Sequence, residues 1–99
     1  MPMDAMQEYR KALTIYAKMP DVKLSLAKLY FRNGQKEKCQ QELEELIKMK
    51  PDLAEAHTWL GILYYKQGRM DTARKYWEKA KQSNPHDAVA RAYLRIAAV

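Results

Sequence analysis

A pattern of residues recurs in this chain at an offset of 34 positions. The stretch 54–85 contains leucine, glycine, tyrosine and proline residues that have similar counterparts 34 places upstream. The matched pairs are Leu26 with Leu60, Ala27 with Gly61, Tyr30 with Tyr64, Gly34 with Gly68, Cys39 with Ala73, Leu43 with Trp77, Leu46 with Ala80 and Pro51 with Pro85. A period of this length is typical of repeat proteins, in which each unit buries its apolar face against its neighbours. We therefore expect a stack of similar helical units.

Glycine and proline mark the ends of the helices in each copy. Gly34 and Gly68 lie between two helical patterns, where the chain reverses and positive φ is easiest for glycine. Pro51 and Pro85 follow the second pattern of each copy, and proline cannot continue a helix. Each copy therefore predicts two helices joined by a glycine turn.

The second copy resembles the tetratricopeptide repeat, a 34-residue helix-turn-helix unit with the pattern W-x2-L-G-x2-Y, A-x3-F and P. The matching residues are Leu60, Gly61, Tyr64, Ala73, Trp77 and Pro85. His57 stands where the pattern has tryptophan, and the first copy is looser. The resemblance implies an all-α fold, a right-handed α-solenoid of antiparallel helix pairs with about six helices. It also implies that the chain binds another protein.

The repeat register predicts a single domain over residues 1–99. We expect a half-repeat helix in 1–19, full repeats in 20–53 and 54–87, and a C-terminal capping helix in 88–99. Helices are predicted at 3–18, 21–33, 36–49, 53–67, 70–83 and 87–99. Asp52 and Glu55 suggest an N-cap with its capping-box partner for the helix that starts near residue 53. Arg95 takes the place of Gly61 in the last helix, so that face is expected to meet water.

Small residues predict where paired helices approach each other. Gly61 and Ala73 are expected on facing surfaces, as are Ala27 and Cys39, because helices pack closely only where side chains are short. Trp77 is expected to be buried between neighbouring repeats. Cys39 is the only cysteine, which excludes an internal disulfide, and its position predicts a small core residue rather than a reactive thiol.

Charge and hydropathy limit the remaining classes of protein. The net charge of +6 raises the possibility of nucleic-acid binding, but in the first half lysines alternate with glutamates, and the more basic second half is expected to carry its charge on solvated outer faces. No apolar run reaches the roughly 18 residues that a bilayer requires, and the start of the chain lacks a secretion signal. A cytoplasmic location is expected, unless a longer parent protein carries a signal or an anchor.

The sequence lacks the motifs of common catalytic and metal sites. We find no glycine-rich phosphate loop and no nucleophile elbow. His57, His86 and Cys39 lack the paired short spacings of zinc ligands. Glu44 and Glu45 are adjacent on a helix expected to face outward, where carboxylates are normally solvated. No enzymatic activity, cofactor or metal is predicted.

The candidate binding surface is a second stripe on the first helix of each repeat. Residues spaced i, i+4, i+7 and i+8 share one helix face. The candidate groove residues are Leu24, Lys28, Phe31, Arg32, Thr58, Trp59, Ile62, Tyr65, Lys66, Ala92 and Ile96. The family resemblance implies that this face forms the wall of a concave groove that holds peptides or helices. Aromatic residues beside cations suit an apolar segment with acidic residues, although Leu24 and Ile62 could equally widen the core.

Three functions are compatible with this pattern. The first is a protein–protein interaction module, a scaffold or adaptor that binds a partner peptide or helix in the groove. The second is self-association, with a homodimer formed through Ala5, Met6, Tyr9 and Ala12 of the first helix. The third is RNA binding by a basic helical repeat.

One known ligand of the family is not predicted. Tetratricopeptide domains that clamp the C-terminal carboxylate of chaperones use Lys and Asn at set positions. This chain has Leu24, Lys28, Trp59, Val89 and Tyr93 at those places.

Overall fold

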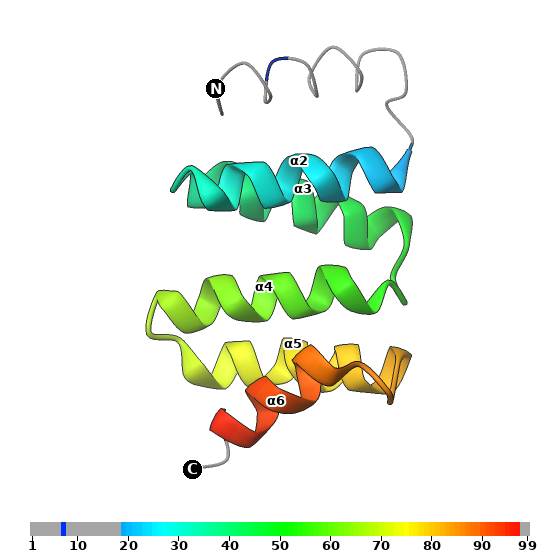
Figure 1. Cartoon of the computed structure of the whole chain (residues 1–99), viewed down its shortest axis with the longest axis vertical. Helices are drawn as coiled ribbons and strands as arrows, with labels where there is room; N and C mark the ends of the chain where they lie inside the picture. The colour runs from blue at the N-terminus through cyan, green and yellow to red at the C-terminus, as the bar shows by residue number, and fades with distance from the viewer. Residues whose placement is uncertain (1–6, 8–18, 98–99) are drawn as a thin grey trace. The chain divides into compact units, whose positions relative to one another are not determined.

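The computed structural model describes residue 7 and residues 19–97, and within this part of the chain all regular structure is helical. The helices are α2 (Pro20–Arg32), α3 (Lys36–Met49), α4 (Ala54–Lys66), α5 (Met70–Ser83) and α6 (Ala88–Ala97), labelled in Figure 1. The prediction of an all-α protein built of antiparallel helix pairs is confirmed. Apart from residue 7, the helix predicted at 3–18, with the self-association surface of Ala5, Met6, Tyr9 and Ala12, lies outside the described residues.

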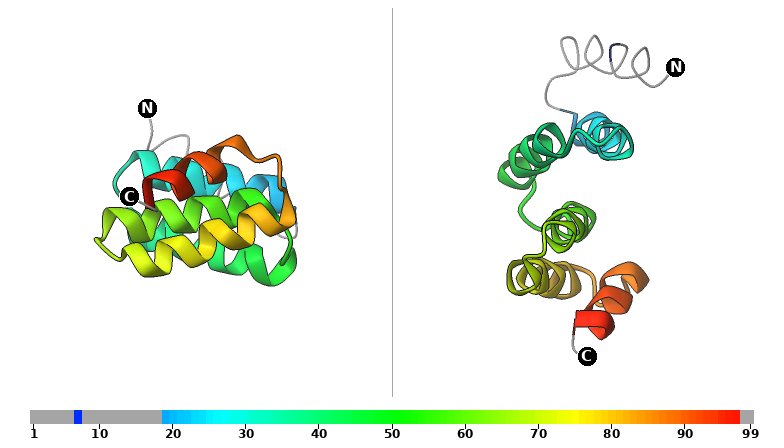
Figure 2. Two further views of the ribbon diagram at one scale, coloured as in Figure 1. Left: turned by 90° about the horizontal axis from the view of Figure 1, so that it is seen from below. Right: turned by 90° about the vertical axis from the view of Figure 1, so that its left-hand side faces the viewer.

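The chain divides into two compact units, residues 1–50 and 51–99. In the first unit, α2 and α3 form an antiparallel hairpin (Figures 1 and 2). In the second unit, α4 and α5 form a similar hairpin, and α6 packs on α5. Gly34 (φ 74°) and Gly68 (φ 81°) occupy the two hairpin turns, as the sequence predicts.

The helix ends confirm the role of the prolines and correct one predicted cap. The helix α3 ends at Met49 and the helix α5 ends at Ser83. Each end is two residues before a proline, Pro51 or Pro85. The N-cap of α4 is Leu53, and no side chain caps that end, so the predicted Asp52 cap is wrong. The turn is tied instead by His57, whose Nε2 donates to the Pro51 carbonyl at 2.7 Å.

The core of the first unit forms where α2 faces α3. Leu26, Ala27 and Tyr30 of α2 are buried, as are Cys39 and Leu43 of α3. Burial, reinforced by the negative charge of Glu42, raises the pKa of Cys39 to about 12. Cys39 is therefore the small core residue that the sequence predicts, and its thiol stays protonated at neutral pH.

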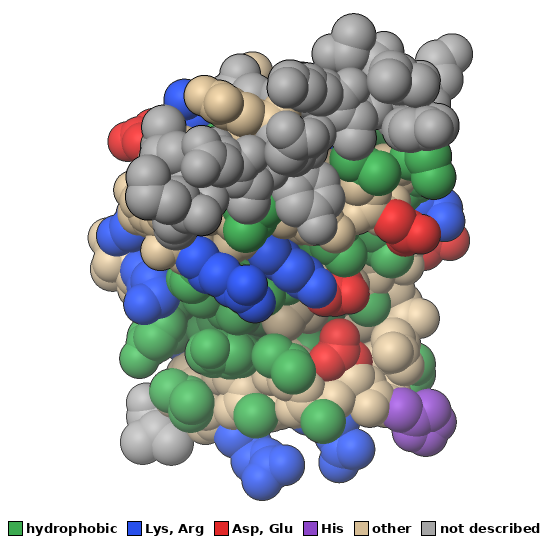
Figure 3. All heavy atoms as spheres, turned by 45° about the horizontal axis from the view of Figure 1, so that its top comes forward, with side chains coloured by type: hydrophobic (Ala, Val, Ile, Leu, Met, Phe, Trp, Pro, Cys, Tyr) green, Lys and Arg blue, Asp and Glu red, His purple; other side chains and the backbone are tan. Residues whose placement is uncertain are grey.

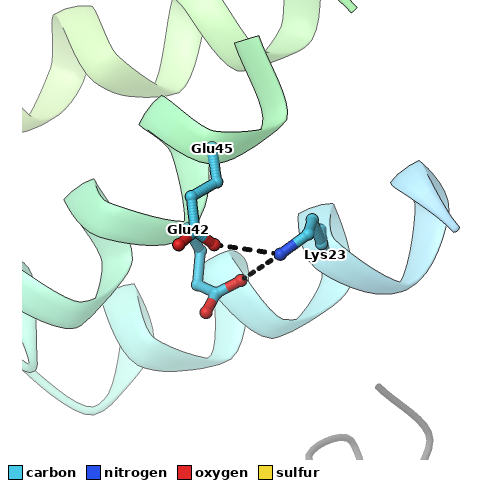
Figure 4. Close-up of polar contacts among 3 residues, drawn as sticks. All are labelled: Lys23, Glu42 and Glu45. Atoms are coloured by element: carbon cyan, nitrogen blue, oxygen red, sulfur yellow. Dashed lines mark hydrogen bonds and ion pairs between the residues drawn. The ribbon is translucent and has the colours of Figure 1, made fainter. Parts of the chain in front are cut away.

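An ion pair also joins the two helices of the first unit. Lys23 Nζ of α2 lies 3.0 Å from Glu45 Oε2 and 3.4 Å from Glu42 Oε2 of α3 (Figure 4). Partial burial by itself lowers the pKa of Lys23, but the hydrogen bonds to the two glutamates and their charges outweigh burial, so the pKa is raised. Lys23 is 19 residues from Glu42 and 22 residues from Glu45 in the sequence. No local pattern in the sequence indicates that their side chains meet.

Trp77 occupies the centre of the second unit and is fully buried, as predicted. Its indole Nε1 donates to the Thr58 carbonyl at 3.2 Å, and its ring stacks on Tyr93 of α6 at 4.8 Å between centroids. A Cβ atom at Gly61 would overlap the Trp77 ring. The space that Gly61 leaves open at the α4–α5 crossing is therefore filled by Trp77.

Two contacts hold α6 on α5. The first is the stack of Tyr93 on Trp77. The second is at the C-terminal end of α6, where Arg74 Nη2 donates to the Ala97 carbonyl at 2.8 Å. Arg95 is exposed, in agreement with the expectation that its side chain reaches water. These contacts fix the face that α6 presents beside α4.

Candidate functional site

A groove of about 860 Å³ lies in the second unit between α4 and α6, and the C-terminal end of α5 closes one end of it. The lining residues are Asp52, Leu53, Ala54, Glu55, Thr58, Trp59, Ile62, Ser83, Asn84, Asp87, Val89 and Tyr93. This volume is within the range of ligand-binding clefts. Three of the residues that the sequence predicts for the binding surface, Thr58, Trp59 and Ile62, are among the lining residues.

Apolar side chains form one part of the groove. Trp59 and Tyr93 are half-buried, Ile62 is buried and Val89 is half exposed. Tyr93 is held by its stack on Trp77 and by an edge contact with Tyr65, whose ring centroid is 6.4 Å away. In Figure 3, hydrophobic side chains gather over the second unit in the lower part of the visible face. This wall is formed before any ligand arrives.

The other part of the groove is acidic. Asp52, Glu55 and Asp87 all line it, and no Lys, Arg or His is among the described residues that do so. Asp87 Oδ1 accepts hydrogen bonds from the backbone N–H groups of Val89 (3.0 Å) and Ala90 (3.2 Å), which caps α6. Thr58 is buried between the two parts, where its hydroxyl donates to the Ala54 carbonyl at 3.1 Å.

The structure distributes the predicted site residues over several surfaces. Thr58, Trp59 and Ile62 line the groove. Ala92 and Ile96 line a smaller hollow of about 420 Å³ on α6, which shares Val89 and Tyr93 with the groove.

The remaining predicted residues lie elsewhere. Tyr65 and Lys66 are exposed at the C-terminal end of α4 and do not line the groove. The other four lie on α2 in the first unit: Leu24, Lys28, Phe31 and Arg32. Arg32 is exposed, and the other three are half-buried.

Sequence reasoning missed the polar end of the groove. Asp52 and Glu55 were interpreted only as capping residues, and Ser83, Asn84 and Asp87 received no binding role. A signal for the apolar side did exist, because Val89, Ala92, Tyr93 and Ile96 follow the i, i+3, i+4, i+7 spacing of one helix face. No comparable local signal joins Asp52 to Asp87, since folding alone brings these two turns together.

Metal binding and membrane insertion have no support in the described part of the chain. Across residues 19–97, no three His, Cys, Asp or Glu side chains are grouped closely enough to hold a metal ion. Among the same helices, none combines the length and apolar character needed to span a membrane.

Helix pairs of this length, joined by glycine turns and repeating every 34 residues, define a helical-repeat protein. The sequence profile described as tetratricopeptide repeat matches residues 24–88, more than half of the chain. The chain therefore belongs to the tetratricopeptide repeat family. No curated protein sequence matches it.

Solved structures share this fold at low sequence identity. The first TPR of Spaghetti (RPAP3), bound to the HSP90 peptide SRMEEVD, superposes with a TM-score of 0.89 at 18% identity, covering 98% of this chain and 77% of that one. The Sgt2 TPR domain from Aspergillus fumigatus gives 0.88 at 21% identity, covering 98% and 66%. MamA gives 0.87 at 23% identity, covering 97% and 56%. The chain thus spans only part of the length of these proteins.

Proposed function

We propose that this chain is a protein-interaction module, a scaffold or adaptor that holds a segment of a partner protein in the groove between α4 and α6. The observation that carries this proposal is the preformed groove of about 860 Å³, which combines an aromatic and aliphatic wall with a polar end. Binding sites of this kind typically bury a few aromatic or aliphatic anchors and fix orientation with a small number of polar groups.

Side chains of the groove wall are held in place by contacts with the core, which supports a binding role for the groove. Tyr93 is stacked on the buried Trp77 ring, and Trp77 is itself hydrogen-bonded to the Thr58 carbonyl. A ligand that meets side chains already held in place loses less conformational entropy on binding. The groove wall therefore offers affinity that an equally apolar but mobile surface would not.

The structural neighbours add a general precedent. The RPAP3 domain is bound to an HSP90 peptide, SRMEEVD, in its structure. That peptide contains two glutamates and an aspartate, whereas the groove of this chain is lined by Asp52, Glu55 and Asp87. We therefore propose peptide binding for this chain without that ligand.

Selection from a displayed random 12-residue peptide library tests the proposal, with the full chain as bait. The peptides recovered are then measured against Trp59→Ala and Tyr76→Ala. Both variants lose a half-buried aromatic ring of the second unit, but only Trp59 lines the groove. A groove anchor is expected to contribute about 1–3 kcal/mol, so Trp59→Ala should weaken binding about 5- to 150-fold.

The control variant decides what the result means. Tyr76 stacks on Tyr64 at 5.5 Å between centroids, so Tyr76→Ala reports the loss of an aromatic contact outside the groove. Binding by folded Tyr76→Ala should remain near that of the unchanged chain. If the two variants weaken the peptides equally, or if no peptide is enriched, the groove is not the binding site.

A further inference from the structure

We infer that the partner segment runs out of the groove and across the exposed face of α6, where a second apolar side chain packs beside Ile96 and an adjacent Asp or Glu pairs with Arg91 or Arg95. The surface concerned is the smaller hollow of about 420 Å³ on this helix, the α6 hollow. This inference rests on the proposed function, because it extends the same binding site and specifies the chemistry of its ligand.

The α6 hollow is an apolar surface that the second unit leaves open. None of the described residues that line it is charged: Ala88, Val89, Ala92, Tyr93 and Ile96. Val89 is 50% exposed and Ile96 is 51% exposed, the highest values among the large hydrophobic side chains described. Covering such side chains removes apolar area from water, which favours a ligand that packs on both.

The α6 hollow is continuous with the groove. Val89 and Tyr93 line both surfaces, so these two side chains lie at the boundary between them. Tyr93 is also fixed in place by its stack on Trp77. A segment that leaves the groove across this boundary therefore meets a second apolar surface, with no change of element between its two anchors.

Two arginines border the α6 hollow on the side away from the groove. Arg91 and Arg95 come three residues after Ala88 and Ala92, and residues three apart are neighbours on a helix surface. Arg95 comes two residues after Tyr93, which places it about 200° around the helix from the boundary with the groove. Figure 3 shows Lys and Arg side chains along the lower edge of the visible hydrophobic area.

These two arginines are available to a ligand. Both are exposed, and neither side chain forms an ion pair within residues 19–97. Arg95 has no Asp or Glu within four residues in the sequence. Asp87 comes four residues before Arg91, but its carboxylate accepts hydrogen bonds from the N–H groups of Val89 and Ala90. A partner carboxylate beside the α6 hollow can therefore form a charge-assisted, bidentate pair with a guanidinium group.

The arginine edge favours an acidic partner over a second copy of this chain. Two α6 helices packed antiparallel about a two-fold axis would bring the same edge of each helix together, and their arginines would repel each other. A partner segment with Asp or Glu matches that edge. Arg91 and Arg95 are one helical turn apart, about 6 Å, and acidic residues two positions apart in an extended segment have a similar spacing.

The peptides selected from the displayed 12-residue library test the apolar part of this inference. We expect them to contain two large apolar residues and at least one Asp or Glu. Ile96→Ala should weaken their binding at least about 5-fold, as the loss of a second anchor implies. Met49→Ala is the matched control, because Met49 is an exposed apolar side chain at the end of α3, outside both surfaces. It should leave binding unchanged.

A second pair of variants tests the acidic part. The double variant Arg91→Gln, Arg95→Gln should weaken the peptides about 2- to 25-fold, since one exposed ion pair contributes about 1.4- to 5-fold. The variant Lys75→Gln, Lys81→Gln removes the same charge from exposed positions of α5 and should bind normally. Added salt should weaken binding by the unchanged chain more than binding by the double arginine variant. Thermal melting checks that all variants fold equally well.

Each alternative outcome has a distinct meaning. Peptides that depend on Trp59 but not on Ile96, or on Ile96 but not on the two arginines, would overturn this inference and leave the proposed function standing. Peptides that depend on neither Trp59 nor Ile96 would overturn both. If light scattering detects a dimer of the unchanged chain that Ile96→Ala abolishes, the occupant is a second copy, and the inference of a separate acidic partner fails.

Discussion

Gly61→Ala in the middle of α4 provides a stringent test of the packing in the second unit, because two opposing effects act at this position. Replacing a helical glycine with alanine normally stabilises a helix by about 1 kcal/mol. Here the added methyl group would overlap the Trp77 ring. That ring cannot retreat easily, since it stacks on Tyr93 and donates a hydrogen bond to the Thr58 carbonyl.

The balance favours destabilisation. Overfilling a packed core costs about 1–3 kcal/mol, and a rigid, fully buried ring places this site at the upper end. Subtracting the gain in helix propensity leaves a net loss of about 2 kcal/mol. In a domain of this size, 1 kcal/mol shifts the Tm by about 4–8 °C, so Gly61→Ala should lower it by about 8–16 °C.

A double-mutant cycle isolates the contact. The first repeat has Ala27 and Leu43 where the second has Gly61 and Trp77, and both residues of the smaller pair are buried. Trp77→Leu should therefore create the space that Ala at position 61 needs. In that background, Gly61→Ala should raise stability by up to about 1 kcal/mol. Thermal melting by circular dichroism measures all four corners of the cycle.

Gly68→Ala is the control for the backbone effect of glycine. Gly68 has φ 81° and no neighbouring atom within 4 Å of an added Cβ, so its replacement is strained by conformation alone. Its cost of about 1–2 kcal/mol should be the same with Trp77 or Leu at position 77. If Gly61→Ala raises the Tm of the unchanged chain, or lowers it equally in both backgrounds, the Gly61–Trp77 contact is refuted.

Two further predictions concern the first unit. Lys23→Met should lower stability at pH 7 by about 1 kcal/mol in urea unfolding, whereas Lys36→Met on the exposed start of α3 should have little effect; equal losses would contradict the ion pair. Because the pKa of Lys23 is raised, its contribution is complete below the unfolded pKa of about 10.4 and is lost as pH rises through the folded value. Cys39 has a pKa of about 12 against an ordinary 9.0, so the unfolded thiol ionises first and stability should fall as pH rises from 9.0 to about 12. Cys39→Ala should remove this slope, and iodoacetamide should label Cys39 quickly only in urea; fast labelling of the folded chain would argue against its burial.

The repeat pattern alone was sufficient to predict most of the fold. The ranges 36–49 and 70–83 agree with α3 and α5, and the other predicted helix bounds that fall within 19–97 differ by one residue. This succeeds because the signals are local: positive φ at Gly34 and Gly68 and the inability of proline to continue a helix act within a few residues. Burial of Trp77 and Cys39 followed from their repeat positions.

Side-chain partners across helices could not be predicted in the same way. A repeat register states that Gly61 and Trp77 lie near a helix crossing, but it does not state that the ring fills the space above the glycine. Lys23 could have paired with several acidic residues, and only the packing of α2 on α3 selects Glu42 and Glu45. The Asp52 cap failed because α4 starts one residue later than predicted, which puts Leu53 at the N-cap position.

The sequence by itself determined the helix pairs and their turns, and it placed Thr58, Trp59 and Ile62, which line the groove, on one side of α4. The tertiary structure decided which carboxylates line that groove. Asp52 and Asp87 are 35 residues apart and belong to different turns, and they line one groove because α5 returns the chain to the end where α4 began. Electrostatic potential depends on distances in space, and a sequence specifies those distances only after its helices have packed.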